Sequence, residues 1–97
     1  MYRVVFTKDF DDSFKHIEES LYRYWHDYSY SDELFEAIKD KLSVLTEMPE
    51  LHAAFKGDQR RFFLQFHGIG YVVIYRLIGH EIQLNRITYT RSDYMGS

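Results

Sequence analysis

The sequence predicts an α+β domain in which a helical hairpin covers one face of a mainly antiparallel sheet. Three observations carry this prediction. A short β-prone run opens the chain, two segments with helical spacing of apolar residues follow, and three runs rich in β-branched and aromatic residues close it. The expected element order is β-α-α-β-β-β, with the last three strands forming an antiparallel meander.

The first half of the chain is expected to form one strand and two helices. Residues 2–7 are β-prone and give the strand. From residue 9 to 28 the apolar residues then recur at steps of three and four, the spacing of one helix face. This first stripe consists of Phe10, Phe14, Ile17, Leu21, Tyr24 and Tyr28.

A second helix is expected after a polar break at residues 29–32, whose Ser and Asp suit a helix cap. Its apolar stripe consists of Leu34, Phe35, Ile38, Leu42, Leu45 and Met48. Pro49 marks its end, because proline cannot continue a helix. Two helices joined by so short a break form an antiparallel αα-hairpin.

The second half of the chain reads as three strands joined by tight turns. After Gly57, apolar and polar residues alternate, although Phe63 makes this strand apolar on both faces. Residues 68–70 are expected to form a hairpin turn, residues 71–77 a central strand, and residues 79–80 a second turn.

The last strand is expected over residues 82–88. Its apolar positions keep an alternating pattern up to Leu84, but the next apolar residue is Ile87, an odd number of positions away. One extra residue in a strand restores such a pattern, so the sequence predicts a β-bulge near Asn85 and Arg86.

Length and composition indicate one domain, assigned to residues 1–94, with residues 95–97 as a tail that is either native or a cloning remnant. The absence of Cys excludes disulfides and thiolate chemistry. No apolar run approaches the length of a membrane span and no secretory signal is evident, so we expect a cytoplasmic protein that does not contact a membrane.

Charge is distributed unevenly along the chain. The net charge is −3, which argues against a general coating of RNA or DNA. From residue 51 onward, however, six Lys or Arg face three acidic residues. A site for a polyanion is therefore expected in the C-terminal half.

Two familiar kinds of site are not indicated by the motifs. The five His residues show no ligand spacing, so we expect no metal and no cofactor. Gly68 and Gly70 lie between two expected strands, with no helix following to present its N–H groups to a phosphate.

An aromatic patch lies around the break between the two helices. Tyr22, Trp25 and Tyr30 lie off the centre of the apolar stripe. They form either the thick edge of the core or a surface that binds a partner, since Tyr and Trp are enriched at interfaces.

A set of Arg and Tyr residues is the most interesting constellation. Arg60 and Arg61 enter the second strand, whereas Arg86, Tyr89, Arg91 and Tyr94 leave the last one. If these strands approach each other, the set converges on a site that could cut RNA without metal, with Arg stabilising the charged phosphorane. The alternative is ordinary solvated Arg on a sheet face, which composition alone favours because no His lies among them.

At this point the sequence resembles the RelE/ParE superfamily of type II toxins, over nearly the whole chain. The resemblance is carried by Thr7-Lys8-x-Phe10-x-Asp12, Ala37-Ile38, Leu45-x-x-x-Pro49-Glu50, Tyr71-x-Val73-Ile74-Tyr75, and Ile82-x-Leu84-x-Arg86-Ile87-x-Tyr89-x-Arg91-x-Asp93-Tyr94. It implies a toxin neutralised by a cognate antitoxin that wraps the helices and the sheet. Val72, Tyr89 and Ser92 depart from the Arg, His and Arg that the pattern has there.

The resemblance implies two activities that a shared fold cannot separate. RelE-like members cleave mRNA on the ribosome, and this metal-independent endoribonuclease activity, blocking translation, is the leading hypothesis. ParE-like members inhibit DNA gyrase without a nuclease. A non-toxic relic that only binds its antitoxin, or an unrelated small interaction domain, completes the alternatives. A homodimer is left open for the chain without antitoxin.

Residue roles follow from the leading hypothesis. Arg61, Arg86, Tyr89 and Arg91 are the candidate catalytic residues. Arg60, Lys56 and Tyr94 are candidates for RNA binding, and Tyr22, Trp25 and Tyr30 for antitoxin binding.

Overall fold

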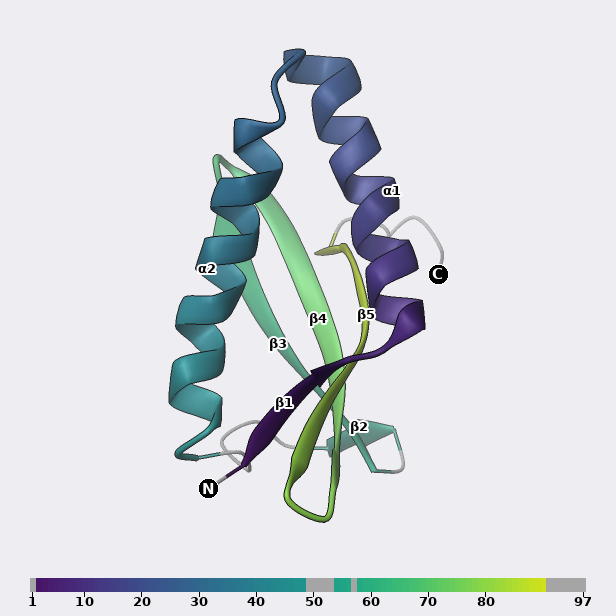
Figure 1. Cartoon of the computed structure of the whole chain (residues 1–97), viewed down its shortest axis with the longest axis vertical. Helices are drawn as coiled ribbons and strands as arrows, with labels where there is room; N and C mark the ends of the chain where they lie inside the picture. The colour runs from purple at the N-terminus through teal and green to yellow at the C-terminus, as the bar shows by residue number, and fades with distance from the viewer. Residues whose placement is uncertain (1, 49–53, 57, 91–97) are drawn as a thin grey trace.

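A computed structural model describes residues 2–48, 54–56 and 58–90, and for 54–56 it describes the backbone alone. The elements in chain order are β1 (Arg3–Phe6), α1 (Lys8–Trp25), α2 (Ser29–Leu45), β2 (Ala54–Lys56), β3 (Gln59–Phe66), β4 (Ile69–Ile78) and β5 (Glu81–Tyr89). The strands form one sheet in the order β1-β5-β4-β3-β2 (Figure 1). No described helix has the length and apolar character needed to cross a membrane.

The predicted α+β class and the antiparallel meander of β3, β4 and β5 are confirmed. β1 joins the meander by pairing with β5 in parallel. β2, which was not predicted from the sequence, pairs with the first two residues of β3. A strand of three residues is too short to show an alternating pattern.

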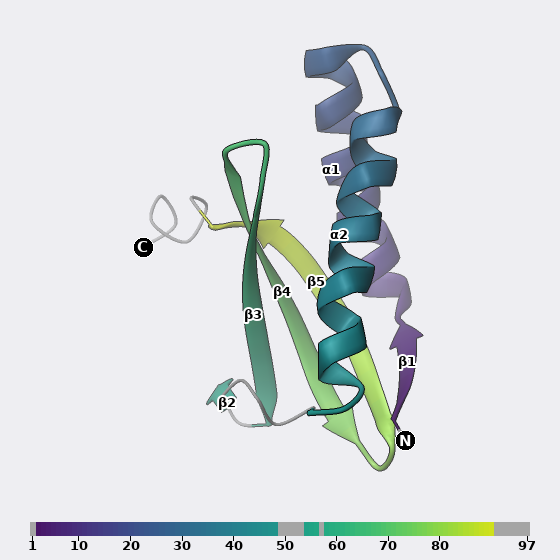
Figure 2. The same cartoon turned by 90° about the vertical axis from the view of Figure 1, so that its left-hand side faces the viewer.

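The helices cover one face of the sheet, as Figure 2 shows. The core between the two layers is mainly apolar, and β4 contributes Tyr71, Val73 and Tyr75 to it; Ser31 is the buried polar residue among those that the structure describes. α1 adds Phe10, Ile17 and Leu21, and α2 adds Leu34, Ile38, Leu42 and Leu45. Most of both predicted helix stripes is thus buried as expected.

The turn between the helices lies earlier than predicted. α1 ends at Trp25, where His26 adopts a left-handed conformation and donates its N–H to the Tyr22 carbonyl at 2.6 Å. The Asp27 carboxylate accepts a hydrogen bond from the Ser29 N–H at 2.9 Å, which lowers the pKa of that carboxyl. Ser29 therefore begins α2, and the polar residues 29–32 lie inside the helix rather than before it.

The ends of both predicted stripes are wrong as core assignments. Tyr24 is 79% exposed and Tyr28 is 56% exposed, and Met48 lies beyond the end of α2 and is exposed. For Tyr24 and Tyr28 the cause is the length of the hairpin, whose tip extends past the end of the sheet (Figures 1 and 2), whereas Met48 follows the opposite, C-terminal end of α2. A helical period can continue in the sequence where no sheet remains to bury it.

The turn between β3 and β4 is made by His67 and Gly68, both with positive φ. This pair is the two-residue hairpin turn that matches strand twist. Ile69 and Gly70 therefore belong to β4 and not to the turn, which corrects the prediction. The predicted turn at residues 79–80 and the predicted bulge are confirmed, because Ile74 pairs with Arg86 whereas Tyr75 pairs with Leu84, leaving Asn85 without a partner.

Candidate functional site

A row of three side chains crosses the face of the sheet that the helices leave open. Arg61 in β3 pairs with Ile74 in β4, and Ile74 pairs with Arg86 in β5. Directly paired residues project to the same side of a sheet. Their chain neighbours Phe62 and Val73 are buried under the helices, so the row lies on the opposite, open face.

The bulge at Asn85 determines where Arg86 lies. Leu84 and Ile87 are both buried in the core although an odd number of positions separates them. Strict alternation from Leu84 would place Arg86 on the helix side and Ile87 on the open face. The extra residue reverses this, so the bulge puts the Arg86 guanidinium on the open face and keeps Ile87 in the core.

Hydrogen bonds fix α1 along the edge of β5. Thr7 donates from its backbone N–H (3.1 Å) and from its hydroxyl (2.8 Å) to the Leu84 carbonyl. The hydroxyl of Ser13 accepts a hydrogen bond from the Ile87 N–H at 3.0 Å and donates to the Phe10 carbonyl at 2.9 Å. The pairing of β5 with β1 ends at Leu84, and beyond that residue α1 forms the hydrogen bond at this edge of β5.

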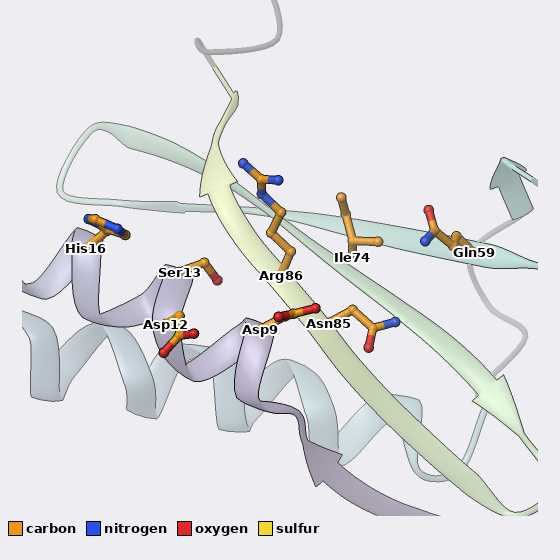
Figure 3. A pocket seen from close by; sticks show the side chains of 8 residues that line it. All are labelled: Asp9, Asp12, Ser13, His16, Gln59, Ile74, Asn85 and Arg86. Atoms are coloured by element: carbon orange, nitrogen blue, oxygen red, sulfur yellow. The ribbon is translucent and has the colours of Figure 1, made fainter.

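A depression of about 580 Å³ lies between α1 and the open face, as Figure 3 shows. Asp9, Asp12 and His16 line it from α1, and Asn85 and Arg86 line it from β5. No His lies among the candidate arginines in the sequence, but His16 lines the same depression as Arg86. Seventy positions separate these two residues, so no motif spacing could have revealed this.

The Arg86 side chain is available to a ligand. It is exposed, and across residues 2–48, 54–56 and 58–90 no ion pair or side-chain hydrogen bond engages its guanidinium. The surroundings are acidic, however, because Asp9 and Asp12 line the same depression. Lys8 lies 3.6 Å from the Asp12 carboxylate and offsets part of that charge.

Arg60 and Arg61 project to opposite faces and so do not act as a pair. Arg61 lies on the open face, with its guanidinium carbon 5.2 Å from the centre of the Phe63 ring. Arg60 pairs with the buried Tyr75 on the helix side. Burial raises the pKa of Tyr75, and the positive charge of Arg60 opposes that rise.

Tyr89 lies on the helix side of the sheet, opposite to Arg86. It pairs with Tyr71, and the ring centres are 5.4 Å apart. The Tyr71 hydroxyl is buried and has no hydrogen-bond partner among the residues that the structure describes. Burial raises the pKa of Tyr71 to about 12, and Tyr89 adds to that rise. The structure thus brings Arg61 and Arg86 to one face and places Tyr89 on the other.

Several candidate residues fall where the structure describes little or nothing. Arg91, Tyr94 and the tail at residues 95–97 lie outside the described residues, and the side chain of Lys56 is not described. Val72, which stands where the toxin pattern has Arg, is 2% exposed and pairs with Phe63 and Thr88. No charged group can therefore act from that position.

The aromatic patch is largely surface. Tyr22 stacks on Tyr28 with ring centres 4.2 Å apart, and Trp25 stacks on Tyr30 at 4.9 Å. Tyr22 and Trp25 are exposed, whereas Tyr30 is partly buried against the core. Both interpretations of the patch therefore apply to part of it: Tyr30 extends the core edge, and the other rings face outward.

Comparisons with known proteins identify one family. The model of that family, described as the ParE toxin of type II toxin-antitoxin system, parDE, matches residues 4–94. No curated protein matches the chain.

Proposed function

The chain belongs to the ParE toxin family of type II toxin–antitoxin systems, and from this premise we propose that it arrests growth by binding DNA gyrase in the cytoplasm, without cutting RNA. The observation that carries the proposal is the separation of the predicted catalytic set. Arg61 and Arg86 lie on the open face of the sheet, and Tyr89 lies on the helix side.

Cleavage of RNA without metal needs a base, an acid and a cation around a single phosphate. Each of these groups acts within hydrogen-bond reach, about 3 Å, of the reacting atoms. Arg86 and Tyr89 have the thickness of the sheet between them, so they cannot contact the same phosphate. Val72 supplies no cation beside them.

The charge around Arg86 favours a protein partner over a nucleic acid. Asp9 and Asp12 line the same depression, and carboxylates repel a phosphate backbone. A protein surface can offer a carboxylate to the arginine and a cation to the aspartates. Arginine is also among the residues that dominate the energetics of protein interfaces.

A supercoiling assay with purified gyrase tests the proposal. We expect the unaltered chain to inhibit supercoiling and Arg86→Ala to weaken inhibition at least about tenfold, the range of a moderate interface hot spot. Arg23→Ala is the matched control, because it removes an exposed arginine from the last turn of α1. Both variants should keep the free energy of unfolding within about 0.5 kcal/mol of the unaltered chain. Full gyrase activity at excess toxin would overturn the proposal.

Cleavage of mRNA on the ribosome is the second candidate, and one observation favours it. His16 lines the depression with Arg86, and histidine is the usual acid–base group near neutral pH. Primer extension after induction would then show codon-linked cuts that His16→Gln abolishes. Harmless overexpression without antitoxin would exclude both activities and leave a protein that only binds its antitoxin.

A further inference from the structure

The outer edge of β3, opposite to its pairing with β4, is covered by another strand at one end only. β4 pairs with β3 from Gln59 to Phe66, whereas β2 pairs with β3 at Gln59 and Arg60 alone. Figure 2 shows β2 beside the start of β3. Of the strands that the structure describes, none pairs with residues 61–66 on this outer edge. An uncovered edge of this length is a place where another strand can join the sheet.

The two-residue turn between β3 and β4 determines which backbone groups face the outer edge. Phe66 and Ile69 flank this turn as a pair, and such a pair exchanges both of its backbone hydrogen bonds. Because the direction alternates along a strand, Phe66 and Leu64 direct their N–H and C=O groups toward β4. Phe63 and Gln65 direct theirs outward, and these outward groups form no hydrogen bond with any described residue.

The side chains along this edge permit another strand to pair with it. Proteins commonly protect an exposed edge with a charged residue, a proline or a β-bulge. Residues 62–66 contain no charge and no proline, and their pairing with β4 is regular. Phe63 is 48% exposed on the open face, and Leu64 is 8% exposed on the helix side. The edge therefore offers apolar side chains together with unpaired backbone groups.

The position of β2 selects the register in which a second copy of this edge can pair with the first. Two copies related by a two-fold axis pair antiparallel, and outward-facing residues must lie opposite each other, so the axis passes through a residue. An axis at Phe63 would place Phe66 of the second copy opposite Arg60, which β2 already covers. An axis at Leu64 confines the pairing to residues 62–66 and gives the longest ladder that avoids β2.

This register brings complementary groups together and keeps like charges apart. Phe63 of each copy lies opposite Gln65 of the other, which gives about four backbone hydrogen bonds across the axis. The two Leu64 side chains meet on the helix side. The two Arg61 residues lie six positions apart along the ladder, about 20 Å, which exceeds the distance of about 10 Å over which salt screens charges.

We propose that two copies of this chain join through the outer edges of their β3 strands, forming one continuous sheet about a two-fold axis at Leu64. The inference goes beyond the proposed function, because it depends on neither gyrase nor the antitoxin. Both open faces lie on the same side of the joined sheet. The dimer therefore presents two rows of Arg61, Ile74 and Arg86 in one direction.

Sedimentation equilibrium of the purified full chain without antitoxin tests this pairing. We expect a reversible equilibrium between monomer and dimer. Gln65→Pro is the test variant, because proline removes the outward N–H group and leaves the hydrogen bonds to β4 in place. Gln65→Ala is the matched control, since it removes the same side chain and keeps that N–H group. We expect the dissociation constant of the dimer to rise at least about tenfold for Gln65→Pro and less than about threefold for Gln65→Ala.

Phe63→Lys provides a second measurement that does not depend on the chain accepting a proline. It places two added cations at diagonal positions across the axis, about 7 to 8 Å apart. Val44→Lys is its control, because it adds the same charge at an exposed apolar position on α2. We expect Phe63→Lys to raise the dissociation constant at least about tenfold, most strongly at low salt, and Val44→Lys to change it less than about twofold. Thermal unfolding of each variant confirms that it is folded.

Three outcomes would overturn the proposed dimer. The unaltered chain could sediment as a monomer at every concentration measured. Gln65→Pro and Gln65→Ala could dimerise equally well, as could Phe63→Lys and Val44→Lys, which would place the interface elsewhere. A monomeric chain whose affinity for the antitoxin falls with Gln65→Pro would assign the edge to the antitoxin instead. The result for gyrase inhibition does not affect any of these measurements.

Discussion

The side of β4 that faces the helices carries Tyr71, Val73 and Tyr75, whereas its other side carries Val72, Ile74 and Arg76. Tyr71, Val73 and Tyr75 are fully buried; on the other side Val72 is buried as well, while Ile74 and Arg76 stay partly exposed. One strand thus serves two purposes with alternate residues. The helix side supplies the apolar burial that stabilises the fold, and the open side carries the arginine row for which we propose a binding role.

Both faces depend on the same register, so neither can change alone. The bulge at Asn85 keeps Ile87 under α1 and puts Arg86 on the open face. The hydrogen bond from the Ile87 N–H to the Ser13 hydroxyl then fixes the distance between α1 and that face. The depression beside Arg86 is therefore a product of the packing on the other side of the sheet.

The largest difference between the two faces is expected for the neighbouring residues Phe62 and Phe63. Phe62 is 0% exposed under the helices, and Phe63 is 48% exposed on the open face. Phe62→Ala should lower the free energy of unfolding by about 3 to 5 kcal/mol, and Phe63→Ala by less than about 1 kcal/mol. Urea denaturation of both variants measures this. Equal losses would mean that the open face is covered in solution.

The second largest effect is expected at alkaline pH, where the protein should lose stability because of Tyr71 on the helix side of the sheet. The pKa of Tyr71 is raised from about 10 to about 12 by burial, so the folded chain holds this proton where the unfolded chain releases it. The contribution of Tyr71 to the free energy of unfolding is fully present below pH 10 and decreases as the pH rises toward 12. Two pKa units correspond to about 2 to 3 kcal/mol.

Tyr71→Phe isolates that contribution. No described residue forms a hydrogen bond with the Tyr71 hydroxyl, so its removal should leave stability at pH 7 nearly unchanged. The variant should lose stability less steeply than the unaltered chain between pH 10 and 12, as followed by urea denaturation at each pH. Buried Tyr75, whose pKa is also raised, remains in both proteins and gives the residual slope. Parallel slopes would show that Tyr71 reaches solvent when folded.

The smallest effect is expected for the hydrogen bond between Ser13 in α1 and Ile87 in β5, which fixes the helix beside the open face. Ser13→Ala leaves the Ile87 N–H without its acceptor and should cost about 1 to 2 kcal/mol. Ser43→Ala is the control, because that exposed hydroxyl only donates to the Asp40 carbonyl one turn before it. The control should change stability by less than about 0.5 kcal/mol. If both variants behave alike, α1 is held on β5 by apolar packing alone.

Alternation and helical period predicted the helices, the meander and the bulge, because each of these patterns follows from which side chains a single element buries. The same rule should have separated Arg60 from Arg61, since adjacent residues in a strand project to opposite faces. Grouping them by proximity in the sequence placed both at one site. The meeting of His16 with Arg86 depends on how α1 lies on β5, and a local pattern contains no information about that contact.

The position of β5 between β1 and β4 has a consequence for synthesis of the chain. The ribosome makes β5 last, yet β1, made first, pairs with it alone among the described strands. Such a long sequence separation delays the completion of a sheet. A nascent chain that has not reached residue 84 has an unpaired first strand and lacks Arg86. A fragment that ends before residue 86 therefore lacks the complete open-face row, on which the proposed inhibition of gyrase depends.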